Sequence, residues 1–225
     1  MNNESRNKTP LRIAILGFAA LVIGLASWFY LIKPNSDMPM PPEVANAYIP
    51  EGRPVVGLQL IDHNNQPFSE QRFKGKWSFL FFGFTHCPDV CPTTLLVMKS
   101  VLAKLPEIAK QAPEPQLLFV SVDPDRDTPA IMKAYTEHYH PDFIGLTGEH
   151  KYLDILTIQV GALYGYEDGD TEKEYTVNHS AQMVLIDPQG HFRAVFTTPH
   201  QVDSIVNTFT AIRQYHRTKN AKNNK

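Results

Sequence analysis

Two long apolar runs limit the fold of this chain more than any other feature. Residues Trp77 to Phe84 and Leu117 to Val122 each have the length of a β-strand and lack the alternation of a half-exposed strand. Such runs are typical of strands buried on both faces of a sheet. The chain has 225 residues, 43% of them hydrophobic and 20% charged, which suits one soluble domain of this kind with an appendage.

Helical segments alternate with these strands, and a strand pair follows them. The predicted helices begin after Pro92 and at Thr128-Pro129, and two more span Leu153–Leu163 and Val202–Tyr215. The other predicted strands are Val55–Ile61, before a turn at His63–Pro67, and the pair Gln182–Ile186 and Phe192–Phe196, joined by the turn Asp187–Gly190. The sequence therefore predicts an α/β sandwich with a mixed central sheet and an extra N-terminal hairpin.

An uncharged segment precedes the predicted domain. The 20 residues from Ile13 to Ile32 would form a helix of roughly 30 Å, enough to cross a bilayer. Arg6, Lys8 and Arg12 stand before it, which predicts an inner-membrane, single-pass anchor with a cytoplasmic N-terminus. The C-terminal domain would then be periplasmic or otherwise extracytoplasmic, in the intermembrane space if the protein is mitochondrial. The alternative, a cleaved signal peptide, lacks a good small-residue cleavage site here.

Composition and charge complete the predicted organisation. The net charge of −2 gives no broad attraction for nucleic acid, so we exclude that class of partner. The predicted parts are a cytoplasmic N-terminus (1–12), a transmembrane anchor (13–32), a Pro-rich linker (33–44), the folded domain (45–216) and a disordered basic tail (217–225).

The two cysteines of the chain, Cys87 and Cys91, lie where a buried strand passes into a helix. Pro92 is well placed in a first helical turn, so Cys91 is predicted at the helix N-terminus and Cys87 in the preceding loop. Helix N-termini favour a thiolate, which is a nucleophile in disulfide exchange and a soft metal ligand. A purely structural disulfide is a weaker interpretation, because so short a loop would yield only about 2 kcal/mol.

Two thiolates need a third, neutral donor to complete a tight site for monovalent copper, and imidazole is suitable. Nine histidines are candidates. His86 adjoins Cys87, but neighbouring side chains usually point apart, and His138 and His140 are predicted to be solvated at the end of a helix. His179 stands in a predicted loop before the strand Gln182–Ile186 and could face the cysteines; spacing alone also allows a surface or capping role.

An acidic run, Asp123, Asp125 and Asp127, suggests calcium, but the positions that an EF-hand loop gives to Gly and Glu are Thr128 and Ala134. We therefore interpret this run as a helix-capping turn, with a partner-docking surface as the alternative.

Several segments together resemble the Sco/SenC family, the copper chaperones of cytochrome c oxidase assembly. They are Cys-Pro-Asp-Val-Cys-Pro after Phe-Phe-Gly-Phe-Thr-His, the segment Val120–Pro129, Gly145–Gly148 and Val177-Asn178-His179, within about residues 50–215. The resemblance implies a thioredoxin-like fold in which Cys87, Cys91 and His179 bind one copper ion, as Cu(I) or Cu(II). Asn178 stands where the family often has Asp, which removes a charge beside the site but no ligand.

The resemblance also implies a function and a partner. The leading hypothesis is a membrane-anchored chaperone that delivers copper to the dinuclear copper site of a cytochrome c oxidase subunit, and other copper chaperones are further candidate partners. The alternative is an enzyme, a thiol–disulfide oxidoreductase with Cys87 and Cys91 as redox-active residues, which reduces that subunit's cysteines before metal loading. A peroxidase would leave the second cysteine and the histidine without a clear purpose, and a non-catalytic anchored binding module would need neither cysteine.

Overall fold

The computed structural model describes residues 9–31, 40, 42–108, 115–169 and 175–223 of the chain. The chain divides into two compact units, residues 1–40 and 41–225. The helices are α1 (Thr9–Leu31), α2 (Pro42–Ala45), the 3₁₀-helix η1 (Glu70–Phe73), α3 (Val90–Ile108), α4 (Pro129–Tyr139), α5 (His150–Val160) and α6 (Val202–Asn223). The strands are β1 (Tyr48–Pro54), β2 (Leu60–Asp62), β3 (Pro67–Phe68), β4 (Ser78–Gly83), β5 (Gln116–Ser121), β6 (Ile144–Thr147), β7 (Tyr164–Asp168), β8 (Tyr175–His179), β9 (Met183–Ile186) and β10 (His191–Phe196).

The N-terminal unit contains the single helix α1. The side chains of its residues 13–28 are exposed. Among the described residues, no helix combines the length and the apolar character that are needed to cross a membrane. Most of the predicted linker, residues 33–39 and 41, lies outside the described part of the chain, and α2 begins within its last residues.

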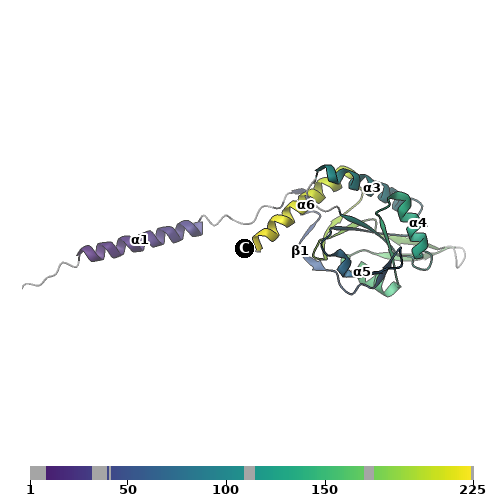
Figure 1. Ribbon diagram of the computed structural model, residues 1–225, viewed down its shortest axis with the longest axis horizontal. Coiled ribbons are helices and arrows are strands. Elements are labelled where there is room, and N and C mark those ends of the chain that lie inside the picture. Colours follow the sequence, from purple (N-terminus) through teal and green to yellow (C-terminus); the bar gives the residue numbers. More distant parts are fainter. Residues whose placement is uncertain (1–8, 32–39, 41, 109–114, 170–174, 224–225) are drawn as a thin grey trace, which may run out of the picture. The chain divides into compact units, whose positions relative to one another are not determined.

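The C-terminal unit is built on an eight-stranded sheet with strand order β1-β10-β9-β4-β5-β6-β2-β3 (Figure 1). β4, β5 and β6 are parallel, and the other neighbours are antiparallel. The central strand β4 is buried at all six residues, as the apolar run predicts. The mixed sheet is confirmed, and β2 and β3 form the expected hairpin around the turn at residues 63–65.

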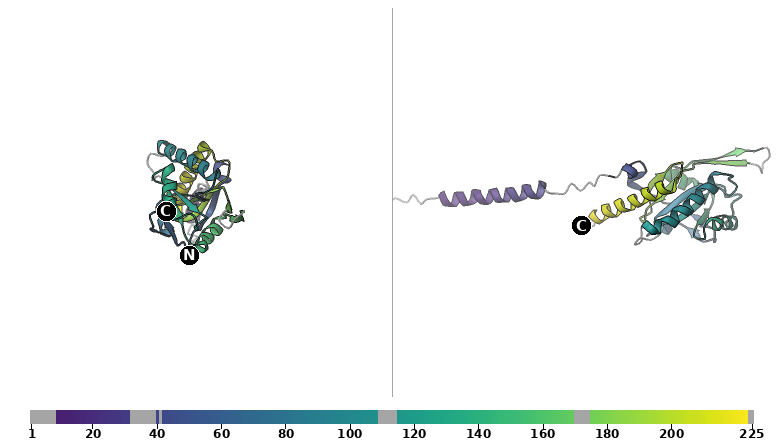
Figure 2. Two further views of the ribbon diagram at one scale, coloured as in Figure 1. Left: turned by 90° about the vertical axis from the view of Figure 1, so that its right-hand side faces the viewer. Right: turned by 90° about the horizontal axis from the view of Figure 1, so that it is seen from above.

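Helices cover both faces of this sheet. The crossovers β4-α3-β5 and β5-α4-β6 run in the same direction across the sheet, so their common handedness places α3 and α4 on one face. α6 packs beside α3 on that face, and α5 covers the other (Figure 1). β7 and β8 form a separate two-stranded sheet, which projects from the end of the unit (Figure 2, right).

The predicted strand Val55–Ile61 is wrong over most of its length. Residues 55–59 belong to no strand, and β2 begins only at Leu60. Gly57 has φ of +74°, a left-handed conformation that interrupts an extended strand. The Val56 amide donates to the Gln159 side chain at 2.9 Å instead of to a neighbouring strand.

Other boundaries also differ from the prediction. α5 spans His150–Val160 rather than Leu153–Leu163, because Gly161 ends it in the left-handed conformation. α6 continues to Asn223, beyond the boundary predicted at residue 216. The sequence patterns did not indicate β1, β6, β7 or β8. His179, expected in a loop, is the last residue of β8.

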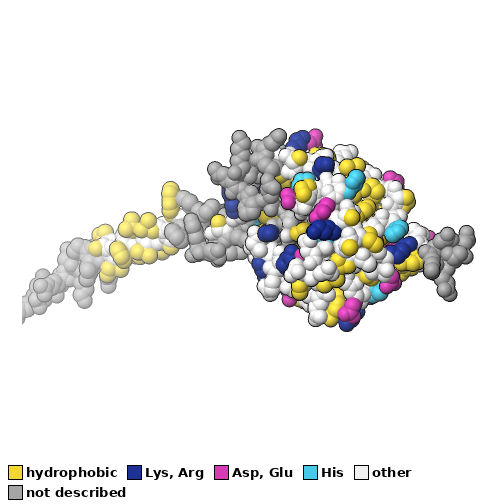
Figure 3. Space-filling model, turned by 45° about the vertical axis from the view of Figure 1, so that its right-hand side comes forward, with side chains coloured by type: hydrophobic (Ala, Val, Ile, Leu, Met, Phe, Trp, Pro, Cys, Tyr) yellow, Lys and Arg dark blue, Asp and Glu magenta, His cyan; other side chains and the backbone are white. Residues whose placement is uncertain are grey.

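The surface of the C-terminal unit carries charges of both signs. On the face drawn in Figure 3, Lys and Arg side chains are interspersed with Asp and Glu, and neither sign forms a broad patch. This mixed distribution agrees with the small net charge of the chain.

Candidate metal centre

The loop between β4 and α3 holds both cysteines. The Cys87 amide donates to the Phe84 carbonyl at 3.2 Å, so the chain turns as it leaves the sheet. Cys91 is the second residue of α3 and is fully buried, while Cys87 is 9% exposed in the preceding loop. Pro92 is tolerated in this first helical turn because its missing N–H would have no partner in the helix. Both positions agree with those inferred from the sequence.

Glycine at position 83 lets Cys91 lie against the end of β4. A Cβ atom on Gly83 would stand 2.4 Å from Cys91 Sγ and 2.8 Å from the Phe119 ring. No real side chain fits at such distances, so the approach of this sulfur to the sheet requires a glycine.

His179 approaches the same place from the end of β8. Its ring meets the rings of Phe81 and Phe84 edge-on, with centroids 6.1 and 5.9 Å away. Nδ1 lies 3.2 Å from the Ser180 carbonyl, which can only accept, so Nδ1 donates there and Nε2 is left to face the cysteines, as donor to a thiolate or as metal ligand. Nε2 lies 3.5 Å from Cys91 Sγ. The ring is thus held with Nε2 toward the cysteines.

Cys87, Cys91 and His179 together form a cluster of three potential ligands whose donor atoms all lie within 4.8 Å of one another. Metal–sulfur and metal–nitrogen bonds of about 2.0–2.3 Å place three ligands of a trigonal ion roughly 3.5–4 Å apart. The cluster therefore needs little movement to enclose one soft ion. In the described part of the chain, this is the single group of three or more Cys, His, Asp or Glu residues that meets this distance limit.

The two sulfurs have unequal acidity, and neither forms a disulfide in this structure. A hydrogen bond from the Cys91 thiol lowers the pKa of Cys87 to about 4, against the opposing effect of burial, and His179 and two backbone amides add to the lowering. The hydrogen bond to Cys87, with burial, raises the pKa of Cys91 far above its usual range. At neutral pH the metal-free pair therefore holds one thiolate, on the more exposed sulfur.

This inequality predicts which cysteine is alkylated in the reduced, metal-free protein. Because a lowered pKa keeps the thiolate charged down to low pH, iodoacetamide at pH 6 is expected to modify Cys87 and to leave Cys91 unmodified. The rate should fall to half near pH 4, measured by mass spectrometry of the peptides. A midpoint near the unperturbed value of about 8.5 would contradict the assignment. Cys87→Ser, the control, should show no modification at pH 6.

A buried carboxylate of the acidic run supports the cysteine loop. Asp127 is fully buried and accepts from the Thr85 amide at 2.9 Å, the Thr85 hydroxyl at 2.5 Å and the Ser121 hydroxyl at 2.6 Å. The capping role belongs to Thr128, whose hydroxyl accepts from the Ile131 amide at the start of α4. The sequence indicates Thr128 as the cap, but not the support of the cysteine loop by Asp127, because Thr85 is 42 positions away along the chain.

The other residues considered from the sequence lie outside the cluster. The His86 side chain is 57% exposed, with Nδ1 3.2 Å from the Thr85 hydroxyl. His138 is exposed in α4, and His140 is the residue that ends this helix. Asn178 is exposed and donates to the Glu167 carboxylate across the β7–β8 hairpin.

Known proteins share this fold and this stretch of sequence. A model of the family SCO1/SenC matches residues 54–214. A putative copper-binding protein of Stutzerimonas stutzeri is 40% identical over 157 residues, which cover 70% of this chain and 76% of that protein. The crystal structure of Arabidopsis thaliana ScoI with copper bound is 33% identical, with a TM-score of 0.66 over 72% of this chain and 99% of that one. BsSco, described as a member of the Sco family of cytochrome c oxidase assembly proteins, has a TM-score of 0.57 at 20% identity, covers 72% of this chain and 94% of that one, and shows the fold alone.

Proposed function

Because the chain belongs to the SCO1/SenC family, we propose that it binds one copper ion through Cys87, Cys91 and His179 and delivers it to the dinuclear copper site of cytochrome c oxidase. The observation that carries this proposal is the convergence of the three donor atoms within 4.8 Å. Relatives described as copper-binding or solved with copper bound support the choice of metal.

The donor set suits Cu(I) in particular. Thiolates are soft ligands, and a neutral imidazole completes a three-coordinate site without adding charge. The residues beside Cys87 are exposed, with Val90 at 38%, so an acceptor's sulfur can approach the ion from this side. Transfer then proceeds by ligand exchange, in which each departing bond is replaced by a bond to the acceptor.

The oxidase as acceptor is supported by membership of the SCO1/SenC family, since the sequence segments resemble chaperones of cytochrome c oxidase assembly. We further propose that residues 13–32 anchor the protein, which would confine donor and acceptor to one membrane surface and raise their effective concentration. The absence of charge over these 20 residues and the basic residues before them support this. A C-terminal alkaline phosphatase fusion should be active and stay in the membrane after a carbonate wash; release into the wash would contradict the anchor.

The experiment that tests copper binding compares the parent with His179→Ala in competition for Cu(I) against a chelator. Loss of one ligand is expected to weaken binding by about a hundredfold, taking about 3 kcal/mol for each ligand of a tight site. Leu163→Ala, which removes an exposed side chain near the end of the same hairpin, is the matched control and should bind as the parent does. A His179→Ala variant that competes as well as the parent would exclude the site.

A thiol–disulfide oxidoreductase remains the second candidate, and the low pKa of Cys87 beside a buried partner thiol favours it. That activity needs both cysteines but not His179 as a ligand. If His179→Ala lost copper affinity but still reduced the acceptor's disulfide at the parent rate, both activities would belong to one dithiol. Failure of the reduced parent to reduce that disulfide would exclude the enzyme.

A further inference from the structure

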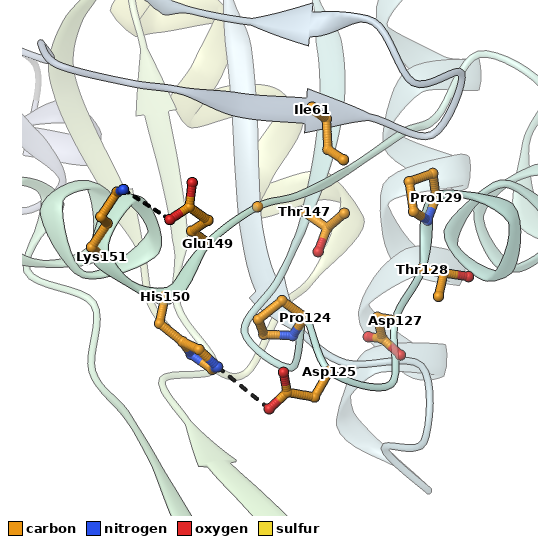
Figure 4. A pocket seen from close by; sticks show the side chains of 11 residues that line it. Ile61, Pro124, Asp125, Asp127, Thr128, Pro129, Thr147, Glu149, His150 and Lys151 are labelled. Carbon is orange, nitrogen blue, oxygen red and sulfur yellow. Dashed lines mark ion pairs between the residues drawn. The ribbon is translucent and has the colours of Figure 1, made fainter.

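The loop between β5 and α4, residues 122–128, has an open side. A pocket of about 590 Å³ lies between this loop and the start of α5, and Pro124, Asp125 and Thr128 form its wall on the loop side (Figure 4). Across it, His150 pairs with Asp125 at 3.5 Å, and the two side chains are 45% and 76% exposed. This exposed pair contributes little, so the loop is held by its buried groups: Asp127, which binds Thr85 and Ser121, and a second set of contacts.

The second set centres on Arg126 and reaches the β7–β8 hairpin. Arg126 Nε donates to the buried Asp123 carboxylate at 2.5 Å, and Nη1 donates to the Tyr175 carbonyl at 3.0 Å. The guanidinium carbon lies 3.7 Å from the centroid of the Tyr175 ring, and the Tyr175 hydroxyl donates to Asp123 at 2.7 Å. Three side chains thus close a ring of charge-assisted hydrogen bonds and a cation–π contact, which are among the stronger polar interactions in proteins.

The hairpin depends on such contacts because it has no ladder to the main sheet. β7 and β8 pair only with each other, and an isolated two-stranded hairpin is marginally stable in water. One further attachment is the Tyr166 hydroxyl, which donates to the Val122 carbonyl at 2.6 Å. Tyr175 begins β8 and His179 ends it, so the Tyr175 contacts set the direction of the strand that carries His179.

Arg126 also contacts the cysteine side of the centre. Its guanidinium carbon lies 5.7 Å from the centroid of the Phe84 ring, and the His179 ring lies 5.9 Å from the same centroid. Phe84 directly follows β4, and its own carbonyl accepts from the Cys87 amide. Arg126 therefore contacts both segments that must converge for a metal to be enclosed.

We propose that Arg126 is the positioning residue for His179, holding the β7–β8 hairpin so that the imidazole reaches the two cysteines. This inference rests on the proposed copper function, since it concerns the third ligand of that site. Arg126 touches neither the metal nor its donor atoms in this role. Its contact with Phe84 belongs to the same role, because the His179 ring packs against Phe84. Arg126 thus acts on the metal site through His179, which makes the role separable from general stabilisation.

The test is a double-mutant cycle on the full chain, with Cu(I) affinity measured by chelator competition. Arg126→Gln is expected to weaken binding by about tenfold, the range for residues that orient a ligand. In the His179→Ala background the same change should have no effect, because the ligand that it positions is gone. In the Cu(II)-loaded form, Arg126→Gln should alter the sulfur-to-copper charge-transfer band as His179→Ala does.

The chain offers a matched control in Arg72→Gln. Arg72 also pairs with a buried aspartate, Asp62, at 3.0 Å and lies over an aromatic ring, Phe68, at 5.0 Å. It stands at the β2–β3 edge, away from the β7–β8 hairpin, so removal of its guanidinium should leave copper affinity unchanged. Should Arg126→Gln not fold, Tyr175→Leu removes the same ring contact and hydroxyl bond and takes its place in the cycle.

The outcomes separate the hypothesis of the copper site from the hypothesis that Arg126 positions His179. A His179→Ala variant with parental affinity would overturn the copper site itself. If His179→Ala weakens binding but Arg126→Gln has no effect, or has an equal effect in both backgrounds, the copper site stands and the positioning role is excluded. An effect confined to the background with His179 supports the role.

Discussion

Cys91→Ser is expected to lower the Cu(I) affinity of this protein by at least about a hundredfold, again taking about 3 kcal/mol for each ligand of a tight site. The hydroxyl of serine is a hard ligand that is not ionised at neutral pH, so it cannot replace a thiolate toward a soft ion. Cys91 is fully buried, and its donor atom is one of the three within 4.8 Å. Chelator competition, with thermal unfolding of the metal-free variant alongside, measures the effect.

The control for this substitution is Thr94→Ser, a buried side chain one turn along α3 that contributes no ligand. It should bind copper as the parent does. Parental affinity in a folded Cys91→Ser variant would exclude Cys91 as a ligand. A variant that binds as weakly as Cys87→Ser would assign both sulfurs to one ion.

Asp187→Asn is expected to lower the free energy of unfolding by about 3–5 kcal/mol, the cost of leaving a buried charge without its partner. Asp187 is fully buried in the β9–β10 turn and accepts from Arg193 Nε at 2.9 Å and Nη2 at 2.6 Å. Arg193, 7% exposed, also donates to the carbonyls of Ile49 and Pro50, and His216 of α6 lies 3.4 Å from the same carboxylate. The carboxylate therefore joins β1, β10 and the last helix.

Titration of the Asp187 carboxyl also predicts that the folded protein loses stability as the pH falls. Burial by itself would raise the pKa of Asp187, but hydrogen bonds from His216, the His191 amide and Arg193 outweigh it and lower the pKa to about 2. Because this pKa is lower in the folded state than the value of 3.8 in the unfolded state, the ionised carboxylate stabilises the fold by about 2 kcal/mol at pH values above 3.8. This contribution is lost as the pH falls from about 4 to 2.

Urea denaturation at several pH values measures both effects. The parent should lose stability between pH 4 and 2 more steeply than Asp187→Asn, in which this titration is absent. Asp203→Asn is the control, because Asp203 is 74% exposed and its pair with Lys104 is a surface contact expected to contribute no more than about 1 kcal/mol. Equal stability of Asp187→Asn and parent at pH 7 would contradict the prediction.

Local pattern was sufficient for the central part of the fold. The apolar runs predict β4 and β5, the Thr128-Pro129 pair predicts the start of α4, and the cysteines lie in the loop and first turn where the sequence indicates them. These features depend on neighbours within a few residues, so the sequence displays them directly. The same patterns did not show β1, β6, β7 and β8, each of which includes polar residues.

What the amino-acid sequence alone determined is the pair of sulfurs, their place at a helix N-terminus and the buried strand before them. Spacing left His179 as one candidate among nine histidines, and the family resemblance singled it out. Its meeting with Cys91 at 3.5 Å was decided by tertiary structure, because the two are 88 positions apart and no local pattern encodes the contact. The roles of Asp127, Arg126 and Asp187 were decided in the same way, since the partners of each carboxylate or guanidinium come from another strand, helix or loop. A buried charge needs such partners, and they come together only when the chain folds around the charged group.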